Sequence, residues 1–159
     1  MSIQIGEKLP EATFNYLKDG VQAINTSELF DNKKVVLFAV PGAFTPTCSV
    51  KHLPGYIEHM AEFEKRGIEV ACISVNDAFV MGAWAKHQEV PETIHMLADG
   101  NGEFTKAIGL ELDATAFGMG LRAKRFALYA ENGVVKNVFL EAPGEFKVSA
   151  ADHVLQSIG

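Results

Sequence analysis

The stretch Pro41-Gly42-Ala43-Phe44-Thr45-Pro46-Thr47-Cys48 stands where the hydrophobic pattern of the chain changes. Before it, residues 35–40 form an uninterrupted apolar run, which is typical of a buried parallel strand. After it, five apolar residues recur at helical spacing and share one face: Leu53, Tyr56, Ile57, Met60 and Phe63. The sequence therefore predicts that a strand passes into a helix here, with Cys48 in the first turn of that helix.

Cys48 occupies a position that favours a reactive thiol. Pro46 suits the first position of a helix, because its missing N–H would have no partner there. The free N–H groups of a first helical turn favour negative charge, so a thiol placed there is biased toward the thiolate. This effect supplies only about 0.3–1 kcal/mol, so a nearby cation is needed as well. The alternative is a buried structural cysteine, and the polar neighbours of Cys48 argue against it.

The same residues carry a resemblance to a known family. Pro41, Thr45 and Cys48 follow the pattern Pro-x-x-x-Thr-x-x-Cys, which resembles the peroxidatic signature of the peroxiredoxins. The longer string over residues 41–49 is similar to the atypical type II, or fifth-class, subgroup. The similarity continues through four further segments and so covers nearly the whole chain: residues 52–55, 74–77, 97–99 and 124–126.

The resemblance implies a role for each residue of the site. The active-site arginine of the family stands in an Arg-Phe context, which makes Arg125 the candidate cation. Together with Thr45 and the backbone N–H groups of Thr47 and Cys48, it is expected to bind the two peroxide oxygens. Pro41 is expected to shape the loop and to screen the thiolate from water.

Two further residues near the site remain open from the sequence. Arg122 is a second candidate for the cation, and either arginine, taken by composition alone, is an ordinary surface residue. His52 lies four residues after Cys48, on the same helical face. A Cys–His nucleophile pair is one interpretation. An arginine-activated thiol needs no base, so we prefer a structural or supporting role for His52.

Cys72, the second cysteine, lies within the apolar segment 68–75, and the simplest interpretation is a buried strand thiol. The functional alternative is a resolving cysteine, as the resemblance to plant-like members suggests. Another branch of the family has its resolving cysteine near the C-terminus, and residues 142–159 contain none. Because a strand rises about 3.3 Å per residue, Cys72 is expected to lie too far below Cys48 for a disulfide without local unfolding.

Size and composition set outer bounds. With 159 residues, 48% of them hydrophobic, we expect a single domain over residues 1–159. A net charge of −6 argues against a nucleic-acid surface, and the longest apolar run is too short to span a bilayer. The histidines lack metal-ligand spacing, and no phosphate-binding or dinucleotide fingerprint is present. Two cysteines and no signal-like N-terminus favour a cytoplasmic protein. We expect no metal or organic cofactor, because in a thiol peroxidase the sulfur itself carries the redox change.

The order of expected elements indicates a mixed α/β domain. A hairpin turns at residues 18–20, and a second one turns at Asn132-Gly133. Asp77 is expected to cap the start of a helix, and Gly67 to end one. Pro54 is expected to kink the helix after Cys48. Residues 149–152 resemble a capping box. Residues 113–120 are expected to be a loop. With the resemblance, the fold class is α/β: a thioredoxin-like fold with a central mixed β-sheet flanked by helices and an N-terminal β-hairpin.

The leading hypothesis is a thiol peroxidase that reduces hydrogen peroxide and alkyl hydroperoxides. Glutathione with glutaredoxin, or else thioredoxin, would recycle the oxidised Cys48, and the resemblance implies a homodimer. A thioredoxin-type disulfide oxidoreductase should carry Cys-x-x-Cys, whereas residues 49–51 are Ser-Val-Lys. A redox sensor that signals through an oxidised thiol is the third hypothesis, and turnover with a recycling reductant would exclude it as the main role.

Overall fold

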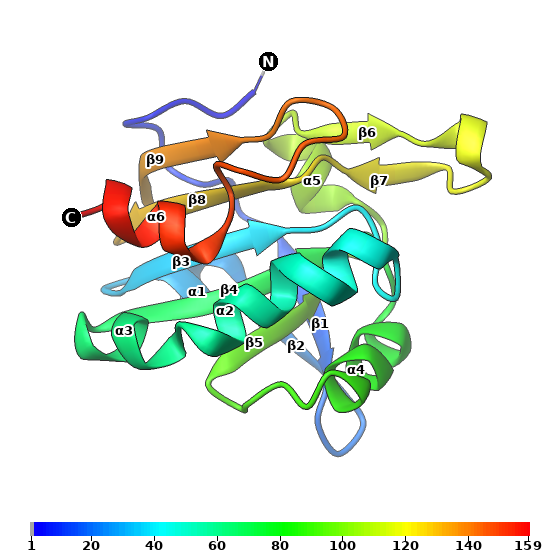
Figure 1. Cartoon of the computed structure of the whole chain (residues 1–159), viewed down its shortest axis with the longest axis horizontal. Coiled ribbons are helices and arrows are strands. Elements are labelled where there is room, and N and C mark those ends of the chain that lie inside the picture. The colour runs from blue at the N-terminus through cyan, green and yellow to red at the C-terminus, as the bar shows by residue number, and fades with distance from the viewer. Residues whose placement is uncertain (1) are drawn as a thin grey trace.

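A seven-stranded mixed sheet forms the centre of the molecule in a computed structural model, which describes residues 2–159 (Figure 1). The strand order is β2-β1-β5-β4-β3-β8-β9, and β3, β4 and β5 run parallel to one another. The strands are β1 (Thr13–Leu17), β2 (Val21–Asn25), β3 (Lys34–Ala39), β4 (Ile68–Ser74), β5 (Ile94–Ala98), β8 (Phe126–Glu131) and β9 (Val134–Leu140). A separate two-stranded ribbon contains β6 (Glu111–Asp113) and β7 (Leu121–Ala123).

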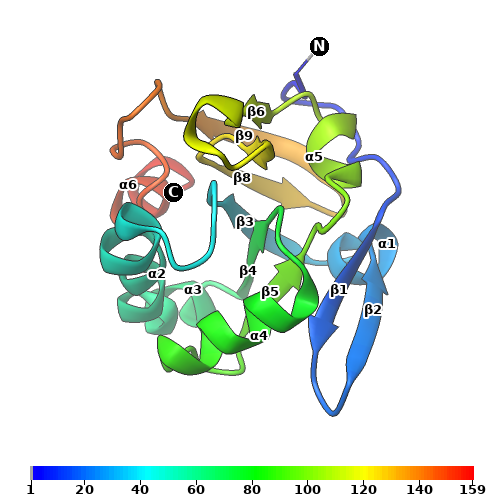
Figure 2. The ribbon, with the colours of Figure 1, turned by 90° about the vertical axis from the view of Figure 1, so that its right-hand side faces the viewer.

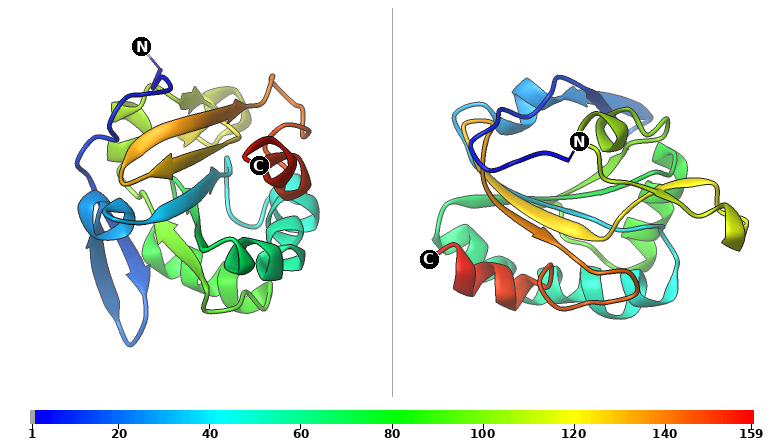
Figure 3. Two further views of the ribbon diagram at one scale, coloured as in Figure 1. Left: turned by 90° about the vertical axis from the view of Figure 1, so that its left-hand side faces the viewer. Right: turned by 90° about the horizontal axis from the view of Figure 1, so that it is seen from above.

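Helices cover both faces of this sheet (Figure 3). They are α1 (Thr26–Phe30), α2 (Leu53–Glu58), α3 (Met60–Lys65), α4 (Ala78–His87), α5 (Glu103–Ala107) and α6 (Ala151–Ser157). Two short turns complete the set: a π-helical turn (η1, Cys48–His52) and a 3₁₀ turn (η2, Thr115–Phe117). This arrangement confirms the predicted fold class, with the N-terminal hairpin of β1 and β2 at one edge.

The central strand β3 divides the core into two clusters, because its side chains alternate between the faces of the sheet. Val36 and Phe38 point to the cluster that contains Cys48 and the buried residues of α2, α3, α4 and α6. Val35 and Leu37 point to the other cluster, which is closed by α1 and α5. All four side chains are fully buried, which explains why the sequence reads as a continuous apolar run here.

Several predicted boundaries are confirmed. Asp77 caps α4, with its Oδ1 accepting from the Val80 N–H at 2.8 Å. Gly67 follows α3 with a φ of +72°, a left-handed conformation that suits glycine. Asn132 and Gly133, both with positive φ, form the turn between β8 and β9.

The loop predicted over residues 113–120 is confirmed except at Asp113, which ends β6. Residues 114–120 contain the 3₁₀ turn η2 and join β6 to β7 in a ribbon that projects beyond the main sheet (Figure 1). Helical backbone begins at Pro46, as the sequence predicts, and leaves α-helical geometry in the π-helical turn, which ends two residues before Pro54, close to the expected kink. A second break, at His59, was not predicted. The expected capping box is absent, since Ala150 is the N-cap of α6 and the Ser149 hydroxyl bonds to Glu141 instead. Among residues 2–159, no helix is long and apolar enough to cross a membrane.

Candidate active site

The loop that carries the candidate site begins where β3 ends, at Ala39. The Val40 N–H donates to the Ile73 carbonyl at 3.1 Å, which ties the end of β3 to β4 before the loop begins. The first backbone bond of the following helix runs from the Ser49 N–H to the Thr45 carbonyl at 3.0 Å. The N–H groups of Thr47 and Cys48 precede that bond and so have no acceptor within the helix. Figure 2 looks onto the end of the sheet where this loop lies.

Cys48 starts the π-helical turn, in which the Leu53 N–H donates to the Cys48 carbonyl five residues earlier. The side chain is 0% exposed and belongs to the larger core cluster. The polar neighbours of Cys48 in the sequence therefore do not expose its sulfur, which is enclosed in the fold.

Arg125 reaches Cys48 because of the pairing between two strands. Strand β8 runs antiparallel to β3, with Phe126 opposite Ala39, so the residue before β8 lies beside the chain that leaves β3. The Nη2 group of Arg125 donates to the Cys48 sulfur at 3.1 Å. The contact places a positive charge directly beside the sulfur. The predicted pairing of Arg125 with Cys48 is therefore present.

His52 lies on the other side of the same guanidinium. Arg125 Nη1 is 2.9 Å from His52 Nδ1, and His52 Nε2 is 3.2 Å from the Ser149 carbonyl oxygen. Because a guanidinium can only donate, Nδ1 must accept, and the single ring proton is on Nε2 and donates to Ser149. Burial, together with the charge of Arg125, lowers the pKa of His52 to about 3. The lone pair of His52 thus faces Arg125, which argues against the Cys–His pair.

The loop before Cys48 is held by short polar contacts. Thr45 donates from Oγ1 to the Gly42 carbonyl at 2.6 Å, which leaves its hydroxyl oxygen able to accept. Phe44 has a φ of +64° and a half-exposed side chain, so the chain turns sharply at this residue. Asn76, for which the sequence suggested no role, accepts from the Ala43 N–H at 3.0 Å and so ties the loop to the end of β4.

Arg122, the second candidate, has other partners. Its Nε donates to the Met119 carbonyl at 2.9 Å and its Nη1 to the Val75 carbonyl at 3.2 Å. A Cβ atom added to Gly42 would lie 3.3 Å from Met119 Cε and 3.5 Å from Arg122 Nη1. Arg122 therefore fastens the β6–β7 ribbon to the Cys48 loop and to the segment after β4, and Arg125 is the arginine on the sulfur.

Cys72 lies in the middle of the sheet, opposite Phe38 of β3 and Met96 of β5. It is fully buried and belongs to the same core cluster as Cys48. Burial raises the pKa of the Cys72 thiol well above its usual value, and the nearby sulfur of Cys48 acts in the same direction. Both cysteines are free thiols. The environment of Cys72 is that of an inert core thiol.

Some residues around the site could not be recognised from the sequence. The Ser149 carbonyl accepts from His52 and, at 2.8 Å, from the Tyr56 hydroxyl. The Phe146 ring lies 6.0 Å from the Arg125 guanidinium carbon and 5.1 Å from the His52 ring. Trp84 donates from its indole N–H to the Ser49 hydroxyl at 3.0 Å. These partners are separated by up to 97 residues in sequence, and no local pattern signals such contacts.

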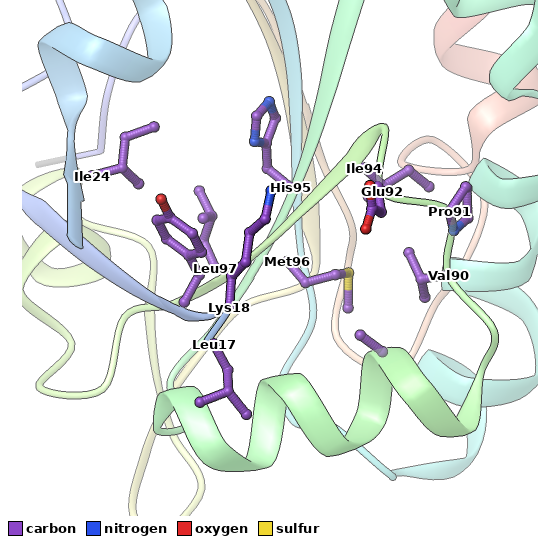
Figure 4. A pocket seen from close by; sticks show the side chains of 12 residues that line it. Leu17, Lys18, Ile24, Val90, Pro91, Glu92, Ile94, His95, Met96 and Leu97 are labelled. Carbon is purple, nitrogen blue, oxygen red and sulfur yellow. The ribbon is translucent and has the colours of Figure 1, made fainter. Parts of the chain in front are cut away.

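A hollow of about 330 Å³ lies elsewhere, between the N-terminal hairpin, α4 and β5 (Figure 4). Its walls are mainly apolar, with Lys18, Glu92 and His95 among the lining side chains. None of the predicted site residues lines it. Over residues 2–159, no three His, Cys, Asp or Glu side chains are grouped so that they could hold a metal ion. The candidate active site is therefore placed at the contact between Cys48 and Arg125 and not at this hollow.

A buried thiol at a helix start, held under a guanidinium on a mixed α/β sheet, defines the class of thiol-based redox domains. The redoxin family model matches residues 4–155 of the chain. Peroxiredoxin-2E, chloroplastic, of Arabidopsis thaliana is 48% identical over 99% of this chain and 70% of its own length. Peroxiredoxin-2B of the same plant is 44% identical over 98% of both chains.

A solved structure extends these comparisons to the fold. Reduced Prx3 of Vibrio vulnificus in complex with hydrogen peroxide superposes with a TM-score of 0.94 at 50% identity, covering 99% of both chains. The chain belongs to the peroxiredoxins of the redoxin family and is an atypical peroxiredoxin with a thioredoxin fold. It is a thiol-dependent peroxidase.

Proposed function

We propose that Cys48 is the peroxidatic residue and that Arg125, Thr45, Pro41 and the N–H groups of Thr47 and Cys48 form the peroxide site. The observation that supports this most is the 3.1 Å contact between Arg125 Nη2 and the Cys48 sulfur. The Cys48 thiolate attacks one peroxide oxygen, so that an S–O bond forms as the O–O bond breaks. The sulfur loses two electrons and becomes a sulfenic acid, and the other oxygen leaves as water or alcohol after taking up a proton.

Oriented donors lower the barrier of this step, because negative charge develops on the leaving oxygen. Arg125 has a further N–H group beyond those on Cys48 and His52, and its charge lies beside the reacting sulfur. The Thr45 hydroxyl donates to the Gly42 carbonyl and can accept a hydrogen bond from a peroxide O–H. Hydrogen peroxide is the first substrate to test, since the Vibrio vulnificus relative is described in complex with it. Small alkyl hydroperoxides are the second.

A thiol reductant completes the cycle, and we propose glutathione with glutaredoxin, with thioredoxin as the alternative. Cys72 is not the resolving residue in this proposal, because it lies inside the sheet between two strands. The oxidised Cys48 becomes accessible when the π-helical turn opens. The turn departs from regular α-helical geometry, as π-helical turns at functional sites often do, which supports it as the part of the site that opens.

The assembly and the compartment are also proposals. Exposed aromatic side chains at Phe44, Phe79 and Phe117, which are 51%, 65% and 81% exposed, support a homodimer. Two free thiols are consistent with a reducing compartment such as the cytoplasm. Sedimentation velocity of the reduced protein at micromolar concentration would detect the dimer, and a monomer at all concentrations would exclude it.

The experiment that tests the function is peroxide consumption, measured separately with glutathione and glutaredoxin and with thioredoxin and its reductase. We expect turnover with at least one system and faster turnover with the first. Reduction of insulin disulfides, assayed in parallel, should be absent because a Cys-x-x-Cys pair is missing. Insulin reduction without peroxide turnover would contradict the proposal and favour a disulfide oxidoreductase.

A further inference from the structure

The polar contacts of the site continue past His52 to a buried carboxylate on the far side. Glu141 follows β9, and its Oε2 accepts from the Ser149 hydroxyl at 2.6 Å and from the Ser149 N–H at 2.8 Å. The same oxygen accepts from the Lys147 N–H at 2.7 Å. Three donors on one carboxylate oxygen fix the segment 147–149 against the end of β9.

Glu141 also holds the backbone of the active-site arginine. Its N–H donates to the Arg125 carbonyl at 3.1 Å, one step beyond the last pair of the β8–β9 ladder. The side chain of Glu141 therefore acts on the Ser149 segment while its backbone acts on Arg125. A single residue connects the two segments that meet at His52.

Ser149 connects Glu141 to the active site, because Glu141 binds its N–H and hydroxyl while its carbonyl faces His52. This carbonyl accepts from His52 Nε2 and from the Tyr56 hydroxyl, so its position depends on how Glu141 holds residue 149. With Nε2 engaged there, the imidazole ring is held so that Nδ1 points its lone pair at Arg125. The Nη1 group of Arg125 then has a fixed acceptor, and the planar guanidinium presents Nη2 to the Cys48 sulfur.

The surroundings of Glu141 favour the ionised form of its carboxyl group. The residue is 8% exposed, and burial alone would raise the pKa of its carboxyl. The hydrogen bonds from Ser149 and from the backbone of residues 147–148 outweigh that effect and lower the pKa. Within residues 2–159, no buried side-chain nitrogen or oxygen is left without a partner, so the chain of contacts from Glu141 to Cys48 is complete.

We propose that Glu141 is a positioning residue for the peroxidase reaction, which orients the Arg125 guanidinium on Cys48 through the Ser149 carbonyl and His52. This inference rests on the proposed function, since it presupposes that Arg125 serves the reaction of Cys48 with peroxide. Removing the anchor leaves every group of the peroxide site in the chain. It allows the Ser149 carbonyl, the His52 ring and the guanidinium to move. Displacements of about 1 Å in a reacting arrangement reduce rates by up to about a hundredfold.

The test compares Glu141→Gln with Glu145→Gln. Glu145 lies on the same segment, is exposed and is paired only at the surface, 3.3 Å from the Lys147 ammonium, so its substitution removes an equal charge without touching the anchor. We expect the rate constant with hydrogen peroxide to fall about tenfold or more in Glu141→Gln. Iodoacetamide alkylation at a pH where the thiol is ionised should stay within about twofold, since alkylation needs the thiolate but not an oriented guanidinium. Glu145→Gln should match the unmodified protein in both assays.

A spectroscopic measurement separates positioning from a general loss of structure. In the unmodified protein, the Nε2–H proton of His52 is buried and hydrogen-bonded, so it should give a slowly exchanging proton resonance, assigned by its absence in His52→Gln. Glu141→Gln should lose this resonance through faster exchange, while Glu145→Gln should keep it. If Glu141→Gln does not fold, Ser149→Ala replaces it, because that change removes the hydroxyl donor and keeps the carbonyl. A smaller rate loss in the same direction is then expected.

The proposal is overturned if Glu141→Gln, or Ser149→Ala in its place, reacts with peroxide at the rate of Glu145→Gln. It is also overturned if peroxide and alkylation rates fall together while the His52 resonance persists. A failure of the proposed function gives a different result. In that case the unmodified protein itself would not consume peroxide, although the His52 resonance would still respond to Glu141→Gln.

Discussion

Arg125 is the residue through which the reactivity of Cys48 is expected to be raised most. In Arg125→Ala, we expect the rate constant with hydrogen peroxide to fall about 10²–10³-fold, which is typical for the loss of one well-placed donor to a transition state. The variant also loses the positive charge that lies beside the Cys48 sulfur. Stopped-flow mixing of the reduced protein with peroxide measures the effect directly.

Lys124→Ala is the matched control, since Lys124 is exposed and its substitution removes the same charge one residue away from Arg125. It should change the peroxide rate by less than about twofold, because exposed charges interact weakly through water. Equal rates for Arg125→Ala and the unmodified protein would show that the guanidinium on the sulfur is only structural.

His52 makes stability depend on pH in a defined window. Its pKa is about 3 in the folded protein and about 6.5 when unfolded, so between these values only the unfolded chain takes up the proton. Stability from this residue is therefore full above about pH 6.5 and is lost as pH falls, by about 1.4 kcal/mol per pH unit. Urea unfolding at pH 7, 6 and 5 should show this decrease in the free energy of unfolding. In His52→Gln, the decrease should be smaller by the contribution of His52. Identical slopes for both proteins would contradict the orientation deduced for the His52 ring.

Single residues show where prediction from sequence succeeds and where it ends. The position of Cys48 between a strand and a helix favours a reactive thiol, but its role, like that of Arg125, was predicted through the family resemblance. The reason is physical: a register of antiparallel strands brings Arg125 to Cys48 across 77 residues. His52 contacts the Ser149 carbonyl, and Glu141 contacts the Ser149 N–H and hydroxyl, so both depend on residue 149, whose place is fixed only by the complete fold.

At the scale of elements, Gly82 marks the contact between α4 and the N-terminal hairpin. A Cβ atom at this position would lie 2.6 Å from Leu17 Cδ2 and 2.9 Å from Leu17 Cβ, so the hairpin must shift to accept it. Gly82→Ala should therefore reduce the free energy of unfolding by about 1–3 kcal/mol, despite the better helix propensity of alanine. Adding Leu17→Ala should recover part of the loss, because it removes the nearest atom.

Gly55→Ala in α2 is the control for this prediction. No atom lies within 4 Å of the Cβ that it would add, so the higher helix propensity of alanine should prevail. We expect an increase in unfolding free energy of about 0.5–1 kcal/mol. Denaturant unfolding of the three variants measures these effects. Stabilisation by Gly82→Ala would indicate that the hairpin is loosely packed on α4.

Elements with strong patterns were the most predictable. The buried strands, both hairpin turns and the caps at Asp77 and Gly67 follow from local sequence, and the structure contains them. The ribbon of β6 and β7 was missed because each strand has only three residues, too few for a pattern. The capping box at residues 149–152 was wrong because the Ser149 hydroxyl has a stronger, charged acceptor in Glu141.

At the scale of the whole molecule, the placement of the two cysteines decides how the oxidised protein is recycled. Cys72 is paired on both sides within the sheet and is buried in the same cluster as Cys48. We expect a disulfide between them to need local unwinding of the π-helical turn. We expect Cys72→Ser to retain most of the glutathione-supported turnover. Mass spectrometry after one equivalent of peroxide should find little intramolecular disulfide. Rapid formation of that disulfide, together with loss of turnover in Cys72→Ser, would make Cys72 the resolving residue.

The central claim is that the Cys48 sulfur carries the reaction, and single-turnover peroxide consumption by Cys48→Ser tests it most directly. The serine hydroxyl is not appreciably ionised at neutral pH, so it cannot replace the thiolate as a nucleophile. With Cys72 still in place, we predict that the variant folds as the unmodified protein does and consumes no peroxide above the buffer rate. Consumption of one equivalent of peroxide by Cys48→Ser, at a rate close to that of the unmodified protein, would contradict the account.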